Sequence, residues 1–109
     1  MKRILSATLA LLLAASFAAA DTWTGWITDS HCGKSKARAG VTAEQVEMCV
    51  KGMNATWQVW SEKDQKGYNV DDPSKVRPFT GKKVKITGTL DAKTNTIKVE
   101  NVETVAQQK

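Results

Sequence analysis

The sequence predicts an all-β domain with one short inserted α-helix, and three observations lead to this prediction. Several short stretches alternate apolar and polar residues with the period of two that is typical of β-strands. A single stretch, residues 43–51, places apolar residues at helical spacing instead. Glycine, proline and aspartate stand between the stretches, as turn residues do.

The N-terminus has the pattern of a cleaved signal peptide over residues 1–20. Lys2 and Arg3 precede an apolar run over residues 4–17, and three alanines follow at 18–20. A membrane anchor is the alternative, but the run is shorter than the roughly 20 residues that span a bilayer. We therefore expect export to the periplasm or the cell exterior, with Asp21 as the first mature residue and no transmembrane segment after cleavage.

The mature chain is expected to form one domain over residues 21–105, followed by a disordered tail at 106–109. Without Lys2 and Arg3 the 16 basic side chains fall to 14, against 11 acidic ones, and the net charge falls from +5 to +3. These charges are scattered along the chain, whereas a nucleic-acid site concentrates them in a patch. We do not expect nucleic acid as a partner.

The first strand is predicted in residues 22–29. Trp23, Gly25 and Ile27 would face inward and Trp26 outward, and the glycine between two tryptophans suggests a bulge or a sharp bend. Asp29 ends this strand.

An insertion at residues 30–55 follows, with a polar loop and then the helix. Thr42 and Gln45 have the spacing of a capping box, and Gly52 stands where a C-cap glycine is expected. Val46, Cys49 and Val50 form the apolar face of this helix.

Four further strands are predicted in the remainder. Residues 56–60 and 68–70 form a hairpin, and 73–78 is a connector with Phe79 filling the core. Residues 81–91 place Val84, Ile86, Gly88 and Leu90 inward, and 96–105 contains a bulge near Asn101. Five short antiparallel strands suit a small OB-like barrel, with an SH3-like barrel as the alternative.

The two cysteines of an exported chain predict one disulfide, Cys32–Cys49, which would stabilise a domain of this size by about 3 kcal/mol. The alternative is a soft-metal site for copper or zinc formed by His31, Cys32 and Cys49, because thiolate and imidazole are ligands of those ions. Zinc prefers four ligands, however, and neighbouring residues do not easily ligate together. We expect the disulfide, with no metal and no cofactor.

Trp26, Trp60 and Tyr68 are a candidate ligand platform. Trp26 and Trp60 fall on the outward faces of their strands, where OB-folds stack ligands on aromatic rings. The interpretation that we favour is that the inserted loop and helix cover both tryptophans, since buried aromatic rings contribute large apolar areas. The single histidine has no nucleophile and acid arranged around it, so we do not expect an enzyme.

Three segments resemble a group of small exported bacterial proteins that have no established activity: WTGWITDSHCG at 23–33, CVKG at 49–52 and FTGKKVKITGTLD at 79–91. The resemblance covers nearly all of residues 22–103 and implies an OB-like β-barrel. Many members carry another cysteine one helical turn before Cys49 and a further histidine in the insertion. Here Gln45 takes the cysteine position, so half of that ligand set is missing.

Together these observations predict an exported, disulfide-linked, non-enzymatic module that binds a small molecule, a saccharide, a peptide or an envelope component. The alternative is a periplasmic copper- or zinc-handling protein. We expect a monomer.

Overall fold

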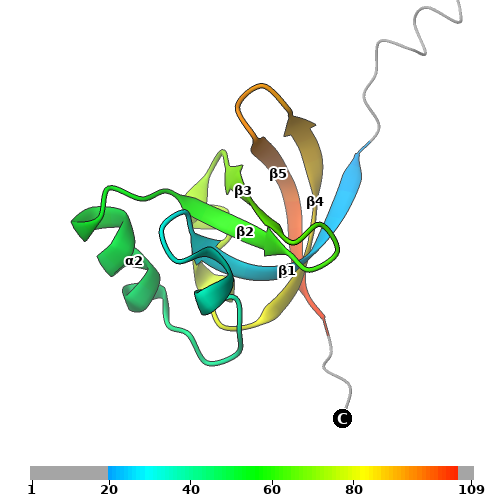
Figure 1. The fold of residues 1–109 in the computed structure, drawn as a ribbon. Helices are drawn as coiled ribbons and strands as arrows, with labels where there is room; N and C mark the ends of the chain where they lie inside the picture. Colours follow the sequence, from blue (N-terminus) through cyan, green and yellow to red (C-terminus); the bar gives the residue numbers. More distant parts are fainter. Residues whose placement is uncertain (1–19, 106–109) are drawn as a thin grey trace, which may run out of the picture.

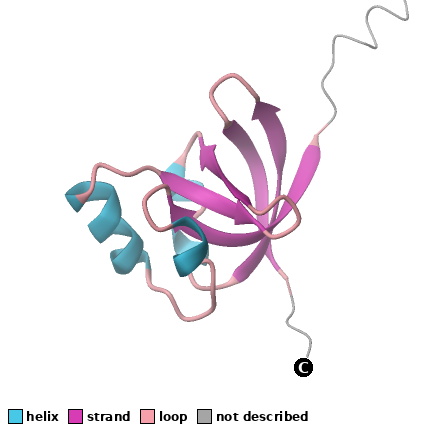
Figure 2. Cartoon of the chain, in the orientation of Figure 1, coloured by secondary structure: helices cyan, strands magenta, loops and turns pink. Residues whose placement is uncertain are grey.

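The computed structural model describes residues 20–105. The predicted signal peptide up to residue 19 and the predicted tail at 106–109 lie outside these described residues. The elements are β1 (Asp21–Asp29), η1 (Gly33–Lys36), α2 (Ala43–Gly52), β2 (Trp57–Ser61), β3 (Lys66–Val70), η2 (Pro73–Lys75), η3 (Arg77–Phe79), β4 (Lys83–Asp91) and β5 (Thr96–Thr104). The predicted all-β class with one inserted α-helix is confirmed (Figure 2).

The five strands close into a ring in the order β1-β2-β3-β5-β4 (Figure 1). The expectation that all strands are antiparallel is wrong at one pair, because β3 and β5 run parallel, with Asn69 opposite Thr96 and Val70 opposite Ile97. The reason is one of parity. Strand direction cannot alternate all the way round a closed ring with an odd number of strands, so at least one neighbouring pair must be parallel.

Strand β1 is the long element that closes the ring. Its first residues pair with β4, from Asp21 to Trp26, and its last residues pair with β2, from Gly25 to Asp29. At the overlap a Cβ on Gly25 would collide with the backbone carbonyl of Trp60. Gly25 therefore allows the close approach of two backbones where β1 passes from one partner to the other.

The core fills the ring and extends under α2. The predicted inward residues Trp23, Ile27 and Trp57 are buried. Val46 of α2 and Val76 between η2 and η3 are fully buried, so both connections contribute to the same core. Phe79 is partly buried against it, as expected for the residue that ends the connector.

Three details differ from expectation at the ends of elements. Gly52 is the last residue of α2 and not a left-handed cap. The residue after it, Met53, has φ −109°, and Asn54 has φ 56°. Leu90, predicted to face inward, is 37% exposed, because β4 extends there beyond the first residue of β1, Asp21, which pairs with Gly88. The predicted bulge in β5 is present: Thr87 pairs with Asn101 and Gly88 with Val99, so Glu100 is the extra residue.

No helix within residues 20–105 is long and apolar enough to span a membrane.

Candidate functional site

Asp29 organises the chain where β1 ends and the insertion begins. Its side chain is fully buried, and Oδ1 accepts hydrogen bonds from the backbone N–H groups of His31 (2.9 Å) and Cys32 (2.8 Å). An aspartate that accepts from the backbone two and three residues onward fixes a turn. The sequence predicted Asp29 only as the end of the strand, and this carboxylate also determines where Cys32 lies.

Lys36 of η1 binds the second oxygen of this carboxylate. Its Nζ lies 3.2 Å from Asp29 Oδ2, 2.7 Å from the Gln45 carbonyl oxygen and 2.9 Å from Cys49 Sγ. Burial acts to lower the pKa of Lys36, but the contacts with Cys49 and Asp29 outweigh it, so the pKa is raised and the ammonium keeps its proton. Lys36 thus links β1 to α2 through three acceptors.

The two cysteines lie in contact beside this ammonium. Cys32 Sγ and Cys49 Sγ are 3.5 Å apart, both side chains are half-buried, and both are free thiols in this structure. Burial raises the pKa of Cys32 first of all, and the hydrogen bond with Cys49 and the charge of Asp29 add to the effect. A disulfide bond is about 2.05 Å long, so the sulfur atoms would need to approach by about 1.5 Å to form one. The disulfide stays a prediction.

The side chains that could ligate a metal ion are not the set that the sequence predicted. Among the described residues, Asp29, Cys32 and Cys49 place their ligand atoms within 4.8 Å of one another, and His31 is not a member of this group. His31 is exposed, and its backbone N–H is what it contributes to the turn. The Lys36 ammonium already contacts Asp29 and Cys49, so the cluster holds an internal cation where a metal ion would have to bind.

The predicted aromatic platform is only partly assembled. Trp26 and Trp60 are directly opposite each other on β1 and β2, and both are half-buried on the outer face. Trp26 Nε1 donates to Glu62 Oε2 at 3.1 Å, while the Trp60 ring lies against Gly33, so η1 covers part of it. Tyr68 does not join them: it is 7% exposed, because it faces inward from β3, and its ring centroid lies 5.9 Å from that of Trp23.

A groove that the sequence analysis missed lies over the ends of β2 and β3. It has a volume of about 480 Å³, within the usual range for ligand sites. Apolar side chains from α2, the α2–β2 connection, β2, β3 and η2 form much of its wall, namely Val50, Ala55, Trp57, Val70 and Pro73. Polar side chains complete it, namely Thr56, Asn69, Asp71 and Thr96. Its residues come from four separate segments, which is why no local motif indicated it.

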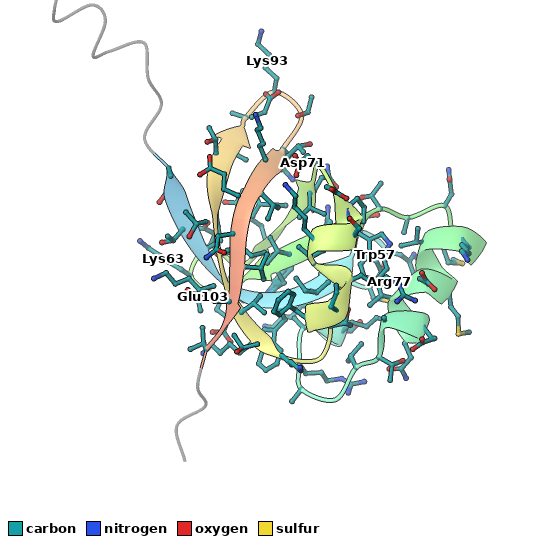
Figure 3. All side chains as sticks on the ribbon, turned by 180° about the vertical axis from the view of Figure 1, so that it is seen from behind. Trp57, Lys63, Asp71, Arg77, Lys93 and Glu103 are labelled. Carbon is teal, nitrogen blue, oxygen red and sulfur yellow. The ribbon has the colours of Figure 1, made fainter. Side chains whose placement is uncertain are left out.

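The polar edge of this groove keeps hydrogen-bonding capacity for a ligand. Asp71 Oδ1 accepts from the Val99 backbone N–H at 2.9 Å, and Oδ2 has no hydrogen-bond partner among residues 20–105. The Trp57 indole N–H makes no hydrogen bond within the described chain, and no fully buried polar side-chain atom there lacks a partner, so this N–H reaches solvent. Figure 3 shows Trp57 and Asp71 on the side of the ring that carries α2.

The groove continues toward the β4–β5 hairpin. A second hollow of about 350 Å³ shares Asp71 and Thr96 with the first and extends to Leu90 and Lys98. A third, of about 380 Å³, is separate: it lies between the start of β1 and the β2–β3 turn and is lined by polar and charged residues, with Trp23 as the exception. A further hollow of about 280 Å³ beside β5 has Phe79, Val99 and Val102 in its wall. The groove over Trp57 has five apolar residues in its wall.

Comparison with protein-family models, with curated proteins and with solved structures finds no match for this chain.

Proposed function

We propose that this protein is an exported, non-enzymatic, OB-like binding module and that the groove over Trp57 is its ligand site. The observation that carries the proposal is the position of the groove. OB-folds bind their ligands on strands 2 and 3 and on the loops that follow strands 1 and 4. The groove is formed by the end of the β1–β2 connection, by β2 and β3, and by the first residue of β5 after the β4–β5 turn.

A neutral saccharide is the ligand class that the polar groups favour. Trp57 is 8% exposed, so little of its ring face is free for stacking, and its N–H reaches solvent. The free N–H donates and the free Asp71 oxygen accepts, and a sugar hydroxyl does both. Asp71 also disfavours a phosphate or a polyanion at this place, which argues against nucleic acid.

Two features outside the groove support the proposal. The predicted signal peptide would carry the protein to a compartment where envelope saccharides are abundant and nucleic acid is scarce. The closed five-stranded ring with one long crossover between β3 and β5 suits an OB-like barrel.

Isothermal titration calorimetry with neutral and N-acetylated oligosaccharides tests the function. We expect saturable binding that Thr56→Trp abolishes, because Thr56 is exposed at the rim and the larger ring would fill the groove. Asp71→Asn keeps an oxygen for Val99 but loses the charge, and should weaken binding about tenfold. Thr104→Trp, at an exposed position outside the groove, should bind as the native protein does.

Short peptides form the second arm of the same titration. Binding of peptides but not of oligosaccharides would change the proposed ligand class from saccharide to peptide and leave the proposed site unchanged. Binding that Thr56→Trp leaves unchanged would overturn the assignment of the site, and no binding in either arm would overturn the function.

A further inference from the structure

The two thiols have different surroundings, because a charged side chain contacts one sulfur atom and not the other. Cys49 Sγ contacts the Lys36 ammonium directly at 2.9 Å, whereas Cys32 Sγ makes no hydrogen bond with Lys36 among the described residues. An Asp29 carboxylate oxygen lies within 4.8 Å of both sulfur atoms, so the contact with Lys36 is what distinguishes them. A nearby cation favours a thiolate, and a nearby anion disfavours it. A disulfide that only links two segments would need neither the Lys36 ammonium nor the Asp29 carboxylate beside it.

We propose that Cys49 and Cys32 form an exchange-active dithiol that reacts with small-molecule or protein disulfides, with Cys49 as the attacking sulfur and Cys32 as the resolving one. This activity is separate from saccharide binding, because neither cysteine lines the groove over Trp57.

The exchange has two balanced steps. The Cys49 thiolate attacks one sulfur of an external disulfide, forms a mixed disulfide and releases the other half as a thiolate. The Cys32 thiol then loses its proton to solvent and attacks the Cys49 sulfur, which forms the Cys32–Cys49 bond and releases the second thiolate. The external disulfide gains two electrons, and the protein dithiol loses them.

The geometry suits the second step. The sulfur atoms are 3.5 Å apart before any reaction, so Cys32 is already placed to resolve a mixed disulfide on its neighbour. Asp29 fixes Cys32 through two backbone hydrogen bonds, and Lys36 ties the same carboxylate to the helix that carries Cys49.

Lys36 also offsets the unfavourable interaction between a Cys49 thiolate and the dipole of α2. Cys49 lies in the last turn of α2, where the helix dipole disfavours a negative charge. The ammonium contacts both Cys49 Sγ and the Gln45 carbonyl oxygen one turn earlier, so it offsets the negative end of the helix beside the sulfur. Lys36 is thus a positioning residue that acts through Cys49.

Single-cysteine variants test the assignment, with Ellman's reagent as the first probe and glutathione disulfide as the second. We expect Cys32→Ser, which keeps Cys49, to react at least about tenfold faster than Cys49→Ser, which keeps Cys32. With glutathione disulfide, Cys32→Ser should accumulate the mixed disulfide, and the native protein should proceed to the internal disulfide.

Lys36 variants separate a chemical role from a structural one. In the Cys32→Ser background, Lys36→Met should slow the reaction about tenfold and Lys36→Arg should restore most of it. In the Cys49→Ser background Lys36→Met should slow the reaction much less, because the Lys36 charge acts on Cys32 without a direct contact. Circular dichroism identifies any variant that fails to fold. The two single-cysteine variants both keep Lys36, so their comparison stands even if a Lys36 variant does not fold.

Equal rates for the two single-cysteine variants, or a faster Cys32, would overturn the proposal. So would a folded Lys36→Met variant whose Cys49 reacts at the native rate. None of these outcomes changes the expected saccharide titration, so failure here and failure of the proposed function remain distinguishable.

Discussion

At the scale of single residues, the carboxylate of Asp29 determines the local structure between β1 and α2. It is fully buried and engages two backbone N–H groups and one ammonium. A buried charge of this kind costs much to desolvate, and it persists only because each partner is in place.

Removing this carboxylate should be among the more damaging substitutions. Asp29→Ala would leave two backbone N–H groups without their acceptor and would remove the one carboxylate that the Lys36 ammonium contacts, so it should lower the free energy of unfolding by about 3 kcal/mol. Urea denaturation measures the change. Glu103→Ala removes an exposed carboxylate that has no side-chain hydrogen bond within the described chain, and it should change the free energy of unfolding by less than about 0.5 kcal/mol. Equal effects would contradict the role given to Asp29.

Little of the Asp29 cluster was predictable from the sequence. The strand end at Asp29 was predictable from the local pattern, and the proximity of Cys32 and Cys49 from the predicted export of a chain with two cysteines. The contribution of Lys36 depends on a 3₁₀ turn, η1, inside a stretch that its polar composition predicts as loop. The participation of Gln45 is a backbone contact, to which its side chain gives no clue.

At the scale of elements, α2 begins as the sequence predicts. Thr42 Oγ1 accepts from the Gln45 backbone N–H at 3.2 Å, and Gln45 Oε1 accepts from the Thr42 N–H at 2.9 Å, which confirms the capping box. Local motifs of this kind are predictable because every interacting group lies within three residues.

Thr42→Ala should lower the free energy of unfolding by about 1 kcal/mol, because it leaves the Gln45 N–H without its side-chain acceptor. Thr42→Ser keeps the hydroxyl and should retain most of the stability. Thermal or urea unfolding of the two variants gives the comparison. A serine variant as unstable as the alanine variant would show that the methyl group, and not the cap, matters.

Glu62 joins three strands at the opposite end of β1 from Asp29. It accepts from Lys83 Nζ at 2.9 Å and from Trp26 Nε1 at 3.1 Å, and these two hydrogen bonds hold its pKa below the ordinary value of 4.5. A carboxylate whose pKa is lowered by folding stabilises the native state above its ordinary pKa, and this contribution is lost as the pH falls through the lowered value.

The Trp26 indole N–H resonance should therefore titrate with a midpoint below pH 4.5. Nuclear magnetic resonance follows this signal directly. Glu62→Gln should remove the titration while leaving the protein folded. A midpoint at or above 4.5 would contradict the lowered pKa.

At the scale of the whole molecule, the number of strands dictates the topology. Alternation along the sequence predicted five strands, and an odd number that closes into a ring requires a parallel pair. The position of that pair, β3 with β5, follows from the chain path: the η2–η3 connector crosses the ring so that β4 pairs with β1 and β5 returns beside β3. Periodicity gives each strand its faces but not its neighbours, so the groove that these neighbours form was not predictable.

Closure of the ring depends on Gly25. Gly25→Ala would force Cβ into the Trp60 carbonyl and should lower the free energy of unfolding by about 3 kcal/mol or prevent folding. Gly52→Ala is the matched control: nothing lies within 4 Å of the added carbon, and alanine favours the helix by about 0.5 kcal/mol. Urea denaturation compares them. A Gly25→Ala variant as stable as the native protein would contradict the close approach of β1 and β2.

The most direct test of the central claim, that the groove over Trp57 binds a saccharide, is a map of the indole N–H resonances during titration of the ¹⁵N-labelled protein. Saccharide binding in this groove should give saturable shifts of the Trp57 indole and of the amides of Thr56, Asp71 and Thr96, with the Trp26 indole unmoved. Shifts at Trp26 with Trp57 unmoved would place the ligand on the outer face of β1 and β2 and contradict saccharide binding at Trp57.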